Sequence, residues 1–208
     1  MRFLKRLLFD DKGSAAVEFG LAIPAVIGLS MGVVEIAYIA FAEATLEGSL
    51  REAARAGVTN FAPEGTSRED YVLGIVLDQM NRFNIEGETE IKTRVYDSFS
   101  DVGRPEPFID QGDPPNGVYD EGECFSDINQ NGVWDSDMGA AGLGGSGSVV
   151  VYEARIRLRH LTPVFAMFSS SEGNSFELSA ATAVRNEPFS FTNTNLGAVA
   201  PQVGDACL

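Results

Sequence analysis

The dominant pattern along the chain is a long run of apolar residues near its start. Residues 19–42 contain a single ionisable side chain, Glu35. A helix of this length reaches ~36 Å, slightly more than the ~30 Å hydrocarbon core of a bilayer. We therefore predict one membrane-spanning helix, which continues beyond the membrane to about Arg55 and ends at Gly57.

Beyond Gly57 the pattern is that of a packed domain. Ser67 to Asp70 resembles a helix capping box and predicts a second helix that runs through Phe83. Residues 90–95, 148–161 and 176–184 alternate apolar and polar side chains, which is typical of half-buried strands. The predicted fold class is α+β: a long N-terminal membrane-spanning helix, then a small head with a second helix and an antiparallel sheet.

Basic residues precede the apolar run and set its predicted orientation. They are Arg2, Lys5, Arg6 and Lys12. Cytoplasmic segments that flank a membrane helix are enriched in Lys and Arg. We therefore predict a single pass with the N-terminus in the cytoplasm and the head outside it.

The composition narrows the function. The chain has 208 residues, a formal net charge of −15 and a hydrophobic share of 44%, which is too apolar for a disordered chain. Such an acidic surface repels nucleic acid, so we exclude a nucleic-acid partner. The acidity is concentrated between Asp97 and Asp137, where eleven carboxylates accompany one cation, Arg104. A stretch with this charge either stays open in solution or collects cations.

This acidic stretch contains an internal repeat. The pattern Phe-x-Asp, followed by Asn-Gly-Val, an aromatic residue and Asp, begins at Phe108 and again at Phe125. The second copy reads Asp-x-Asn-x-Asn-Gly-x-x-Asp, which is close to the calcium loops of EF-hands and dockerin-like repeats. The candidate metal ligands are Asp127, Asn129, Asn131, Val133 (through its carbonyl), Asp135 and Asp137 in the second copy, and Asp110, Asp113, Asn116, Asp120 and Glu123 in the first.

Both copies depart from the calcium-loop pattern. The twelfth position of the second loop, normally a bidentate glutamate, is Met138. In the first loop Asp120 and Glu123 fall at the ninth and twelfth positions. Gly112 and Pro114, however, occupy the first and third positions. We predict a compact tandem loop that binds calcium weakly, with a Kd of about 10⁻⁴–10⁻³ M. The alternative is Asx or hairpin turns stabilised by local side-chain bonds.

Glu18 separates three interpretations of the N-terminal segment. A secretory signal peptide would explain the small residues Ala40 and Ala42, but the apolar run is longer than a signal core of about 7–15 residues. A plain single-pass anchor leaves Glu18 and Glu35 unexplained, because ionisable groups at membrane depth are disfavoured by several kcal/mol. The third interpretation provides a positively charged group with which the Glu18 carboxylate can pair.

That third interpretation rests on a resemblance. The sequence Gly-Ser-Ala-Ala-Val-Glu from Gly13 to Glu18, after a basic leader, resembles the processing site of type IV pilins and pseudopilins. The resemblance implies cleavage between Gly13 and Ser14 by a prepilin peptidase, which makes Glu18 the fifth residue of the mature chain. The new ammonium of Ser14 and the carboxylate of Glu18, on the same or an adjacent subunit, can then pair.

The stretch from Lys12 to Gly57 resembles the TadE-like family, minor pilins (pseudopilins) of tight-adherence pili, and Glu35 matches a glutamate in the middle of the family helix. The resemblance implies an assembly role for Glu18 and Glu35. It implies other pilins or pseudopilins as partners through the N-terminal helix. It also implies a location in the bacterial inner membrane, with the head periplasmic or extracellular. We divide the chain into a leader (1–13), a pilin-like helix (14–57) and a head (58–208) that contains the acidic loop (106–139) and a flexible Gly-rich spacer (139–148).

Two further features complete the predictions. Cys124 and Cys207 permit a disulfide that ties the acidic segment to the C-terminus, or they are two unrelated thiols. His160 ends a predicted strand without a matching catalytic motif, so we predict no enzyme. The predicted function is a structural or assembly component of a tight-adherence pilus with a calcium-stabilised loop. The alternative is a membrane-tethered calcium-binding or adhesive module outside any filament.

Overall fold

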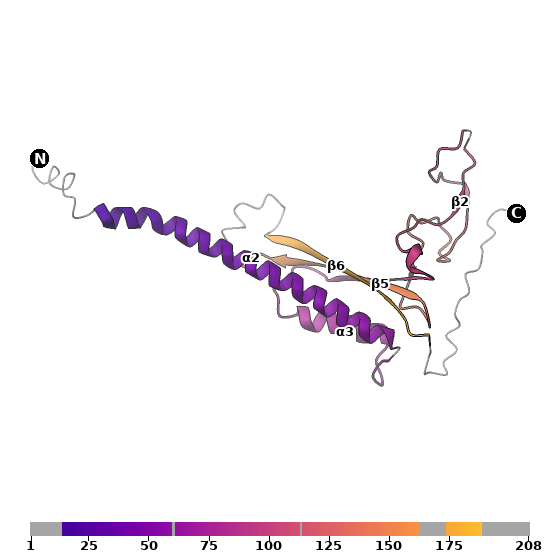
Figure 1. The fold of residues 1–208 in the computed structure, drawn as a ribbon, viewed down its shortest axis with the longest axis horizontal. Coiled ribbons are helices and arrows are strands. Elements are labelled where there is room, and N and C mark those ends of the chain that lie inside the picture. The colour runs from indigo at the N-terminus through magenta and orange to yellow at the C-terminus, as the bar shows by residue number, and fades with distance from the viewer. Residues whose placement is uncertain (1–13, 60, 113, 163–173, 189–208) are drawn as a thin grey trace, which may run out of the picture.

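The long N-terminal helix is the largest element of the structure, a computed structural model that describes residues 14–59, 61–112, 114–162 and 174–188. Helix α2 (Ser14–Val58) is continuous over 45 residues and includes Pro24. Its N-terminal half extends well beyond the rest of the molecule (Figure 1). The large apolar side chains there are highly exposed, for example Phe19 (69%) and Leu29 (74%). Among the described residues, it is the one helix long and apolar enough to cross a membrane.

Helix α3 (Arg68–Met80) begins at the predicted capping box. The backbone N–H of Asp70 donates to the Ser67 hydroxyl (3.0 Å), and this hydroxyl donates in turn to the Asp70 carboxylate (2.7 Å). The helix ends three residues before the predicted Phe83, which packs into the core from the following turn. The capping residues therefore locate the start of the helix better than the apolar spacing locates its end.

The head contains an antiparallel sheet of four strands in the order β4-β1-β5-β6. These are β1 (Glu90–Tyr96), β4 (Ala140–Ala141), β5 (Val149–Arg159) and β6 (Ser175–Arg185). A 3-10 turn, η2 (Phe99–Asp101), follows β1, and β2 (Phe108–Ile109) pairs with β3 (Cys124–Phe125) in a separate two-stranded sheet. The α+β fold class is confirmed, and the three long predicted strands are present within two residues of their predicted ends.

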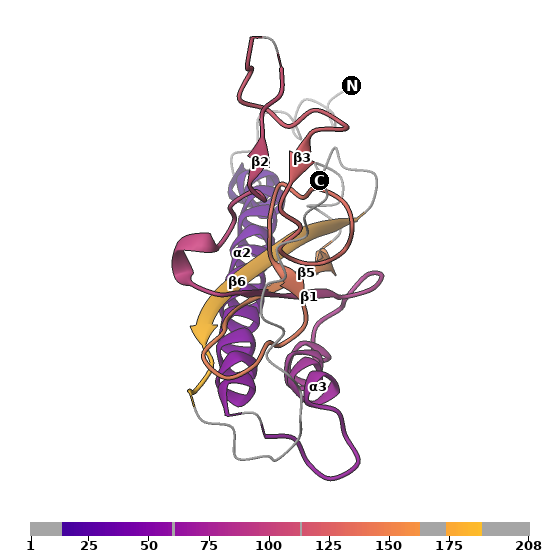
Figure 2. The same ribbon diagram turned by 90° about the vertical axis from the view of Figure 1, so that its right-hand side faces the viewer.

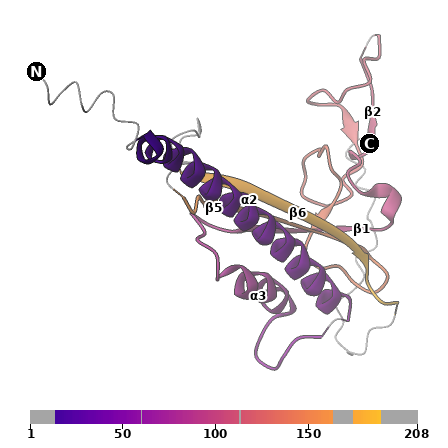
Figure 3. The ribbon, with the colours of Figure 1, turned by 60° about the vertical axis from the view of Figure 1, so that its left-hand side comes forward.

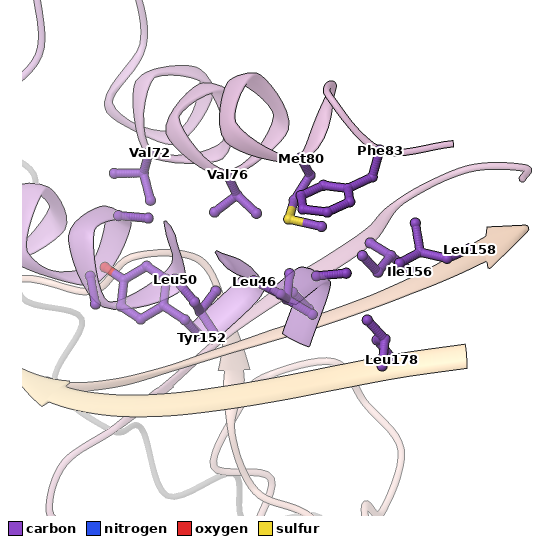
Figure 4. Packing of buried hydrophobic residues seen from close by; sticks show 14 of the residues in the cluster. Leu46, Leu50, Val72, Val76, Met80, Phe83, Tyr152, Ile156, Leu158 and Leu178 are labelled. Atoms are coloured by element: carbon purple, nitrogen blue, oxygen red, sulfur yellow. The ribbon is translucent and has the colours of Figure 1, made fainter. Parts of the chain in front are cut away.

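The core lies between the two helices and one face of the sheet (Figure 4). The alternating apolar residues of β5 are all buried on this face: Val150, Tyr152, Ala154, Ile156 and Leu158. The C-terminal half of α2 contributes Leu46 and Leu50, and α3 contributes Val72, Val76 and Met80. Both helices lie on the same side of the sheet, with α3 alongside the C-terminal half of α2 (Figures 2 and 3). Because side chains on a strand alternate between the two faces of the sheet, every second residue of β5 packs against the two helices.

Arg68, at the first turn of α3, ties several parts of the head together. Its guanidinium donates to the carbonyl oxygens of Gly57 (2.6 Å), Leu143 (3.2 Å) and Gly144 (3.1 Å) and to Oδ1 of Asn186 (3.5 Å). Burial lowers the pKa of this guanidinium, because removal from water disfavours its charged form. Arg68 therefore joins the end of α2 to the loop before β5 and to the end of β6.

The Gly-rich segment differs from the predicted flexible spacer. Ala140 and Ala141 form β4 at the edge of the main sheet, where they pair with β1. Leu143 is buried, and its carbonyl also accepts from the side chain of Asn186 (2.9 Å). Residues 139–148 are therefore packed against the head, so they fix the position of the acidic segment that precedes them.

The head begins to cover α2 at Glu35. This residue is fully buried, and Ala42, Leu46 and Leu50 farther along α2 belong to the core. The predicted membrane span, however, ran to Ala42. Met31 and Gly32 are already half-buried and Glu35 is the first fully buried residue, so the part of α2 without a buried side chain ends at Val34. From Ser14 to Val34 the helix is about 31 Å long, which still matches a hydrocarbon core of about 30 Å.

Candidate functional site

Glu35 is held by a turn of the head that follows β5. Its carboxylate accepts hydrogen bonds from the backbone N–H groups of Leu161 (3.1 Å) and Thr162 (2.9 Å) and from the Thr162 hydroxyl (2.9 Å). Nδ1 of His160 lies 2.9 Å from the same carboxylate. A buried carboxylate is stable only when its oxygens are satisfied in this way. His160, a strand-end residue as expected, thus helps to fix the head to the helix.

This arrangement changes how an assembly role for Glu35 can work. The carboxylate is enclosed by residues of its own chain, so it is not presented to a neighbouring helix. The sequence pattern had suggested an ionisable group within the membrane span. An assembly role for Glu35 stays a prediction, and such a role would act through the position of the head on α2.

The predicted processing site lies at the N-terminal end of α2. Gly13 lies outside the described residues, and Ser14 is the first residue of the helix. Glu18 follows one helical turn later and is exposed on the apolar half of the helix. The spacing required for pairing between a new N-terminus at Ser14 and the Glu18 carboxylate is therefore present in the helix.

The duplicated acidic segment forms a module at the end of the sheet far from the N-terminus (Figure 1). Its two copies meet through the antiparallel pairing of β2 with β3, in which Phe108 faces Phe125. The phenylalanines that begin the two copies therefore lie opposite each other. We call residues 106–137 the double-loop module.

Hydrogen bonds of side chains at the predicted ligand positions organise the second loop. The Asp127 carboxylate accepts from the backbone N–H of Asn131 (3.1 Å) and of Gly132 (2.8 Å). Gly132 has a φ of +83°, which a residue with a side chain rarely adopts, so the sharp turn requires glycine here. The side-chain amides of Asn129 and Asn131 both reach Oδ2 of Asp135. The side chains of the third, fifth and ninth loop positions therefore converge.

The first loop repeats this geometry despite its insertion. The Asp110 carboxylate accepts from the backbone N–H of Gly112 (3.1 Å) and of Gly117 (2.6 Å), and Gly117 has a φ of +74°. The Asn116 amide reaches Oδ2 of Asp120 (2.8 Å), as Asn131 reaches Asp135 in the second loop. Asp110 therefore takes the first ligand position. The alternative candidate, Asp113, lies outside the described residues.

Glu123 closes the first loop. One oxygen of its carboxylate accepts from the backbone N–H of Gln111 (2.8 Å), and the other accepts from that of Asp120 (3.0 Å). Gln111 follows the first loop position, and Asp120 is the ninth. Glu123 thereby bridges the two ends of the loop, which is the place of the twelfth-position glutamate in an EF-hand.

Glu106 has the same role in the second loop, and the sequence analysis missed it as a site residue. Its carboxylate is fully buried and accepts from the backbone N–H groups of Ile128 (2.8 Å), Asn129 (3.2 Å) and Asp135 (3.1 Å). It therefore fills the position that Met138 leaves vacant in the loop sequence. A signal was present: Glu106 and Glu123 each stand two residues before the phenylalanine of their own copy. Each loop is thus closed by the glutamate that precedes the other copy.

An aromatic cluster joins the two loops. Tyr119 and Trp134 occupy the same place in the two copies, and their rings stack at 4.5 Å with an interplanar angle of 11°. Phe108 and Phe125 pack edge-on against this pair. The Trp134 indole N–H also donates to the Glu106 carbonyl (2.9 Å). Because Trp134 is the only tryptophan of the chain, its emission reports on this module.

Asp137 lies outside the loop that it was predicted to complete. It forms an ion pair with Arg94 and accepts from the Tyr96 hydroxyl (2.8 Å), both on β1. Burial and this hydrogen bond to Asp137 raise the pKa of the Tyr96 hydroxyl. Asp137 therefore anchors the double-loop module to the sheet, and its role as a metal ligand stays a prediction.

Cys124, in β3, is part of a disulfide. The chain has one other cysteine, Cys207, which lies outside the described residues. The pairing of Cys124 with Cys207 therefore stays a prediction.

The chemistry of the module suits a hard cation, although carboxylates alone do not define a site. Within the described ranges, no three His, Cys, Asp or Glu side chains are arranged to hold a metal ion. The convergent groups include asparagine amides, whose oxygen and nitrogen ends exchange by a half-turn of the side chain. No lysine or arginine occurs between Arg104 and Arg155. The carboxylates of the module thus have no lysine or arginine within the module to neutralise them, and carboxylate and amide oxygens are the ligands that calcium prefers.

Comparisons with known proteins identify only the N-terminal segment. The family model described as TadE-like protein matches residues 13–55. No curated protein and no solved structure matches the chain. The matched segment begins at Gly13, covers most of α2 and leaves out the head. The resemblance inferred from the N-terminal residues is thus confirmed: the chain carries a TadE-like segment, and that family suggests a component associated with tight-adherence pili.

Proposed function

We propose that this protein is a structural, non-enzymatic component of a tight-adherence pilus, processed after Gly13 and inserted in the bacterial inner membrane through α2. The observation that carries the proposal is the family match over residues 13–55, which includes the exposed apolar half of α2. Such a helix is unstable in water unless lipid or other helices cover it. Its partners would be other pilins or pseudopilins, and a prepilin peptidase would remove the leader.

Glu18 supplies the specificity of this assembly. Cleavage after Gly13 creates an ammonium on Ser14, four residues before Glu18. A carboxylate and an ammonium that are paired cost far less at membrane depth than either charge alone. Pairing with the N-terminus of a neighbouring subunit would fix the axial register of two packed helices.

We expect the protein isolated from its natural host to begin at Ser14. Intact-mass measurement checks this directly, because loss of residues 1–13 changes the mass by a known amount. We further expect Glu18→Ala to insert and to be processed, yet to be lost from the pilus fraction. Glu43→Ala, at an exposed position of the same helix, should assemble normally. A different mature N-terminus, or normal assembly of Glu18→Ala, would contradict the proposal.

We also propose that the double-loop module binds calcium, one ion in each loop. The ligands would come from Asp127, Asn129, Asn131, Asp135, the Val133 carbonyl and Glu106 in one loop, and from Asp110, Asn116, Asp120 and Glu123 in the other. The support is that, in each copy, an asparagine amide hydrogen-bonds to an aspartate and a glutamate closes the loop. Calcium would replace the contacts that now close each loop, and it would hold the module rigid on the head.

Calcium addition to the metal-free protein should shift the emission of Trp134 and raise the thermal midpoint of the head. The response should be half-complete at about 10⁻⁴–10⁻³ M calcium, the range of extracellular modules. Asp127→Asn should abolish the response, whereas Glu121→Gln, an exposed carboxylate of the same module, should keep it. An unchanged emission and thermal midpoint at millimolar calcium would show that the loops are ordinary Asx turns.

The competing function is a membrane-tethered calcium-binding or adhesive module that never enters a filament. It predicts the same calcium response but an intact leader and no dependence on Glu18. The two functions are therefore separated by the mass of the mature protein and not by the metal.

A further inference from the structure

We propose that the turn at residues 160–162, at the base of the head, lies in the interface of the lipid bilayer beside α2. The turn would be a second membrane contact, in addition to the spanning helix. This inference rests on the proposed function in one respect, namely that the apolar half of α2 lies in a membrane.

The hydrogen bonds of Glu35 set the height of this turn. Leu161 and Thr162 both donate their backbone N–H groups to the Glu35 carboxylate, at 3.1 Å and 2.9 Å. Glu35 is the first fully buried residue of α2, so it directly follows the stretch of helix that has no buried side chain. That stretch, residues 14–34, is about 31 Å long and so matches the thickness of a hydrocarbon core. A turn bound at residue 35 must therefore lie where the helix leaves the membrane.

The turn is chemically suited to this depth. Unsatisfied backbone groups are costly near lipid, but the N–H groups of Leu161 and Thr162 and the Thr162 hydroxyl are all used by Glu35. The His160 side chain is almost fully enclosed, and its backbone N–H donates to Asn174 (2.9 Å). The Leu161 side chain is nevertheless 54% exposed. The turn thus exposes an apolar side chain, while its backbone N–H groups at residues 161 and 162 already have an acceptor within the protein.

The surroundings favour lipid over a specific protein partner. Ile36 is 63% exposed and Phe41 is 58% exposed, and the helical period puts them on different sides of α2 from Glu35. Apolar side chains therefore stand on both sides of α2 that the head leaves uncovered, whereas a protein-binding patch would occupy one side. Phe83 packs against both Tyr38 and Phe41, and the Tyr38 hydroxyl accepts from the backbone N–H of Asn84 (3.3 Å). Amphipathic aromatic residues gather at this level of membrane proteins.

Site-specific fluorescence in vesicles tests this placement. The full-length protein is reconstituted in phosphatidylcholine vesicles, and one cysteine at a time carries an environment-sensitive dye under non-reducing conditions. The variants are Leu161→Cys in the turn, Leu29→Cys within the exposed helix, and Val133→Cys in the double-loop module, where the valine is 58% exposed. Wild-type protein is treated with the same dye, to measure how far the native cysteines are labelled. Quenching is measured with nitroxide-bearing lipids and, separately, with iodide in the water.

We expect the dye at position 161 to be quenched several-fold more by nitroxide lipids than the dye at position 133, and several-fold less by iodide. Lipids with the nitroxide near the headgroup should quench it best, while Leu29→Cys should respond to deeper nitroxides. If position 161 behaves like position 133 while position 29 is in lipid, the inference is wrong and the membrane helix stands. If position 29 also behaves like position 133, insertion of α2 itself fails, and the inference fails with it.

Discussion

Removal of the Glu106 carboxylate is expected to open the second loop of the double-loop module. Glu106→Ala leaves three partly buried backbone N–H groups without their acceptor, those of Ile128, Asn129 and Asp135. Each unsatisfied buried donor costs about 1–3 kcal/mol, so we expect a total loss of about 4 kcal/mol. Such a loss corresponds to roughly a thousandfold decrease in amide protection.

Amide hydrogen exchange measured by mass spectrometry reads this loss directly. Peptides that cover residues 128–135 should exchange much faster in Glu106→Ala, while peptides from β5 should stay protected, because the sheet has its own core. Glu106→Gln should give an intermediate result, since the amide keeps one acceptor oxygen. Glu121→Ala removes an exposed carboxylate from the same module and should change little. Equal exchange in Glu106→Ala and the wild type would show that the buried carboxylate does not hold the loop.

Replacement of Glu35 by leucine is expected to release the base of the head from α2. The substitution is close in size, but it removes the acceptor of two backbone N–H groups, one hydroxyl and the His160 ring. Hydrogen bonds to a charged group contribute about 1.5–3 kcal/mol each. Hydrogen bonds to water partly replace them once the turn separates from α2. We expect local stability at Leu161 and Thr162 to fall by about 3–5 kcal/mol.

The same exchange measurement, in detergent or vesicles, follows the amides of residues 161 and 162. Glu43→Leu is the matched control, because Glu43 is an exposed glutamate two turns along the same helix. Glu35→Gln should retain part of the protection by accepting through its carbonyl oxygen. Slow exchange at residue 161 in Glu35→Leu would mean that apolar packing alone holds this turn. The hydrogen bonds to Glu35 would then contribute nothing to its local stability.

The elements that the sequence predicts well are those with local causes. The alternation of Val150 to Leu158 predicts both β5 and its buried face, and Ser67 predicts the start of α3. The repeat in the acidic segment likewise predicts two similar loops. In each case neighbouring residues along the chain carry the information, because period and capping depend on contacts within a few residues.

The features that the sequence did not predict depend on contacts between distant residues. Glu106 closes a loop that begins more than twenty positions later, and Glu35 binds a turn more than a hundred positions away. Neither partner can be recognised from residues nearby. The same holds for residues 139–148, whose glycines suggested flexibility but whose carbonyls are bound by Arg68 and Asn186.

By itself, the sequence therefore determined the TadE-like N-terminal segment, the α+β order of elements and the existence of two acidic loops. Local chemistry was sufficient for each of these. Only the tertiary structure decided where the open part of α2 ends and which glutamate completes each loop. Buried carboxylates require donors on several sides, and only a folded chain can bring those donors together.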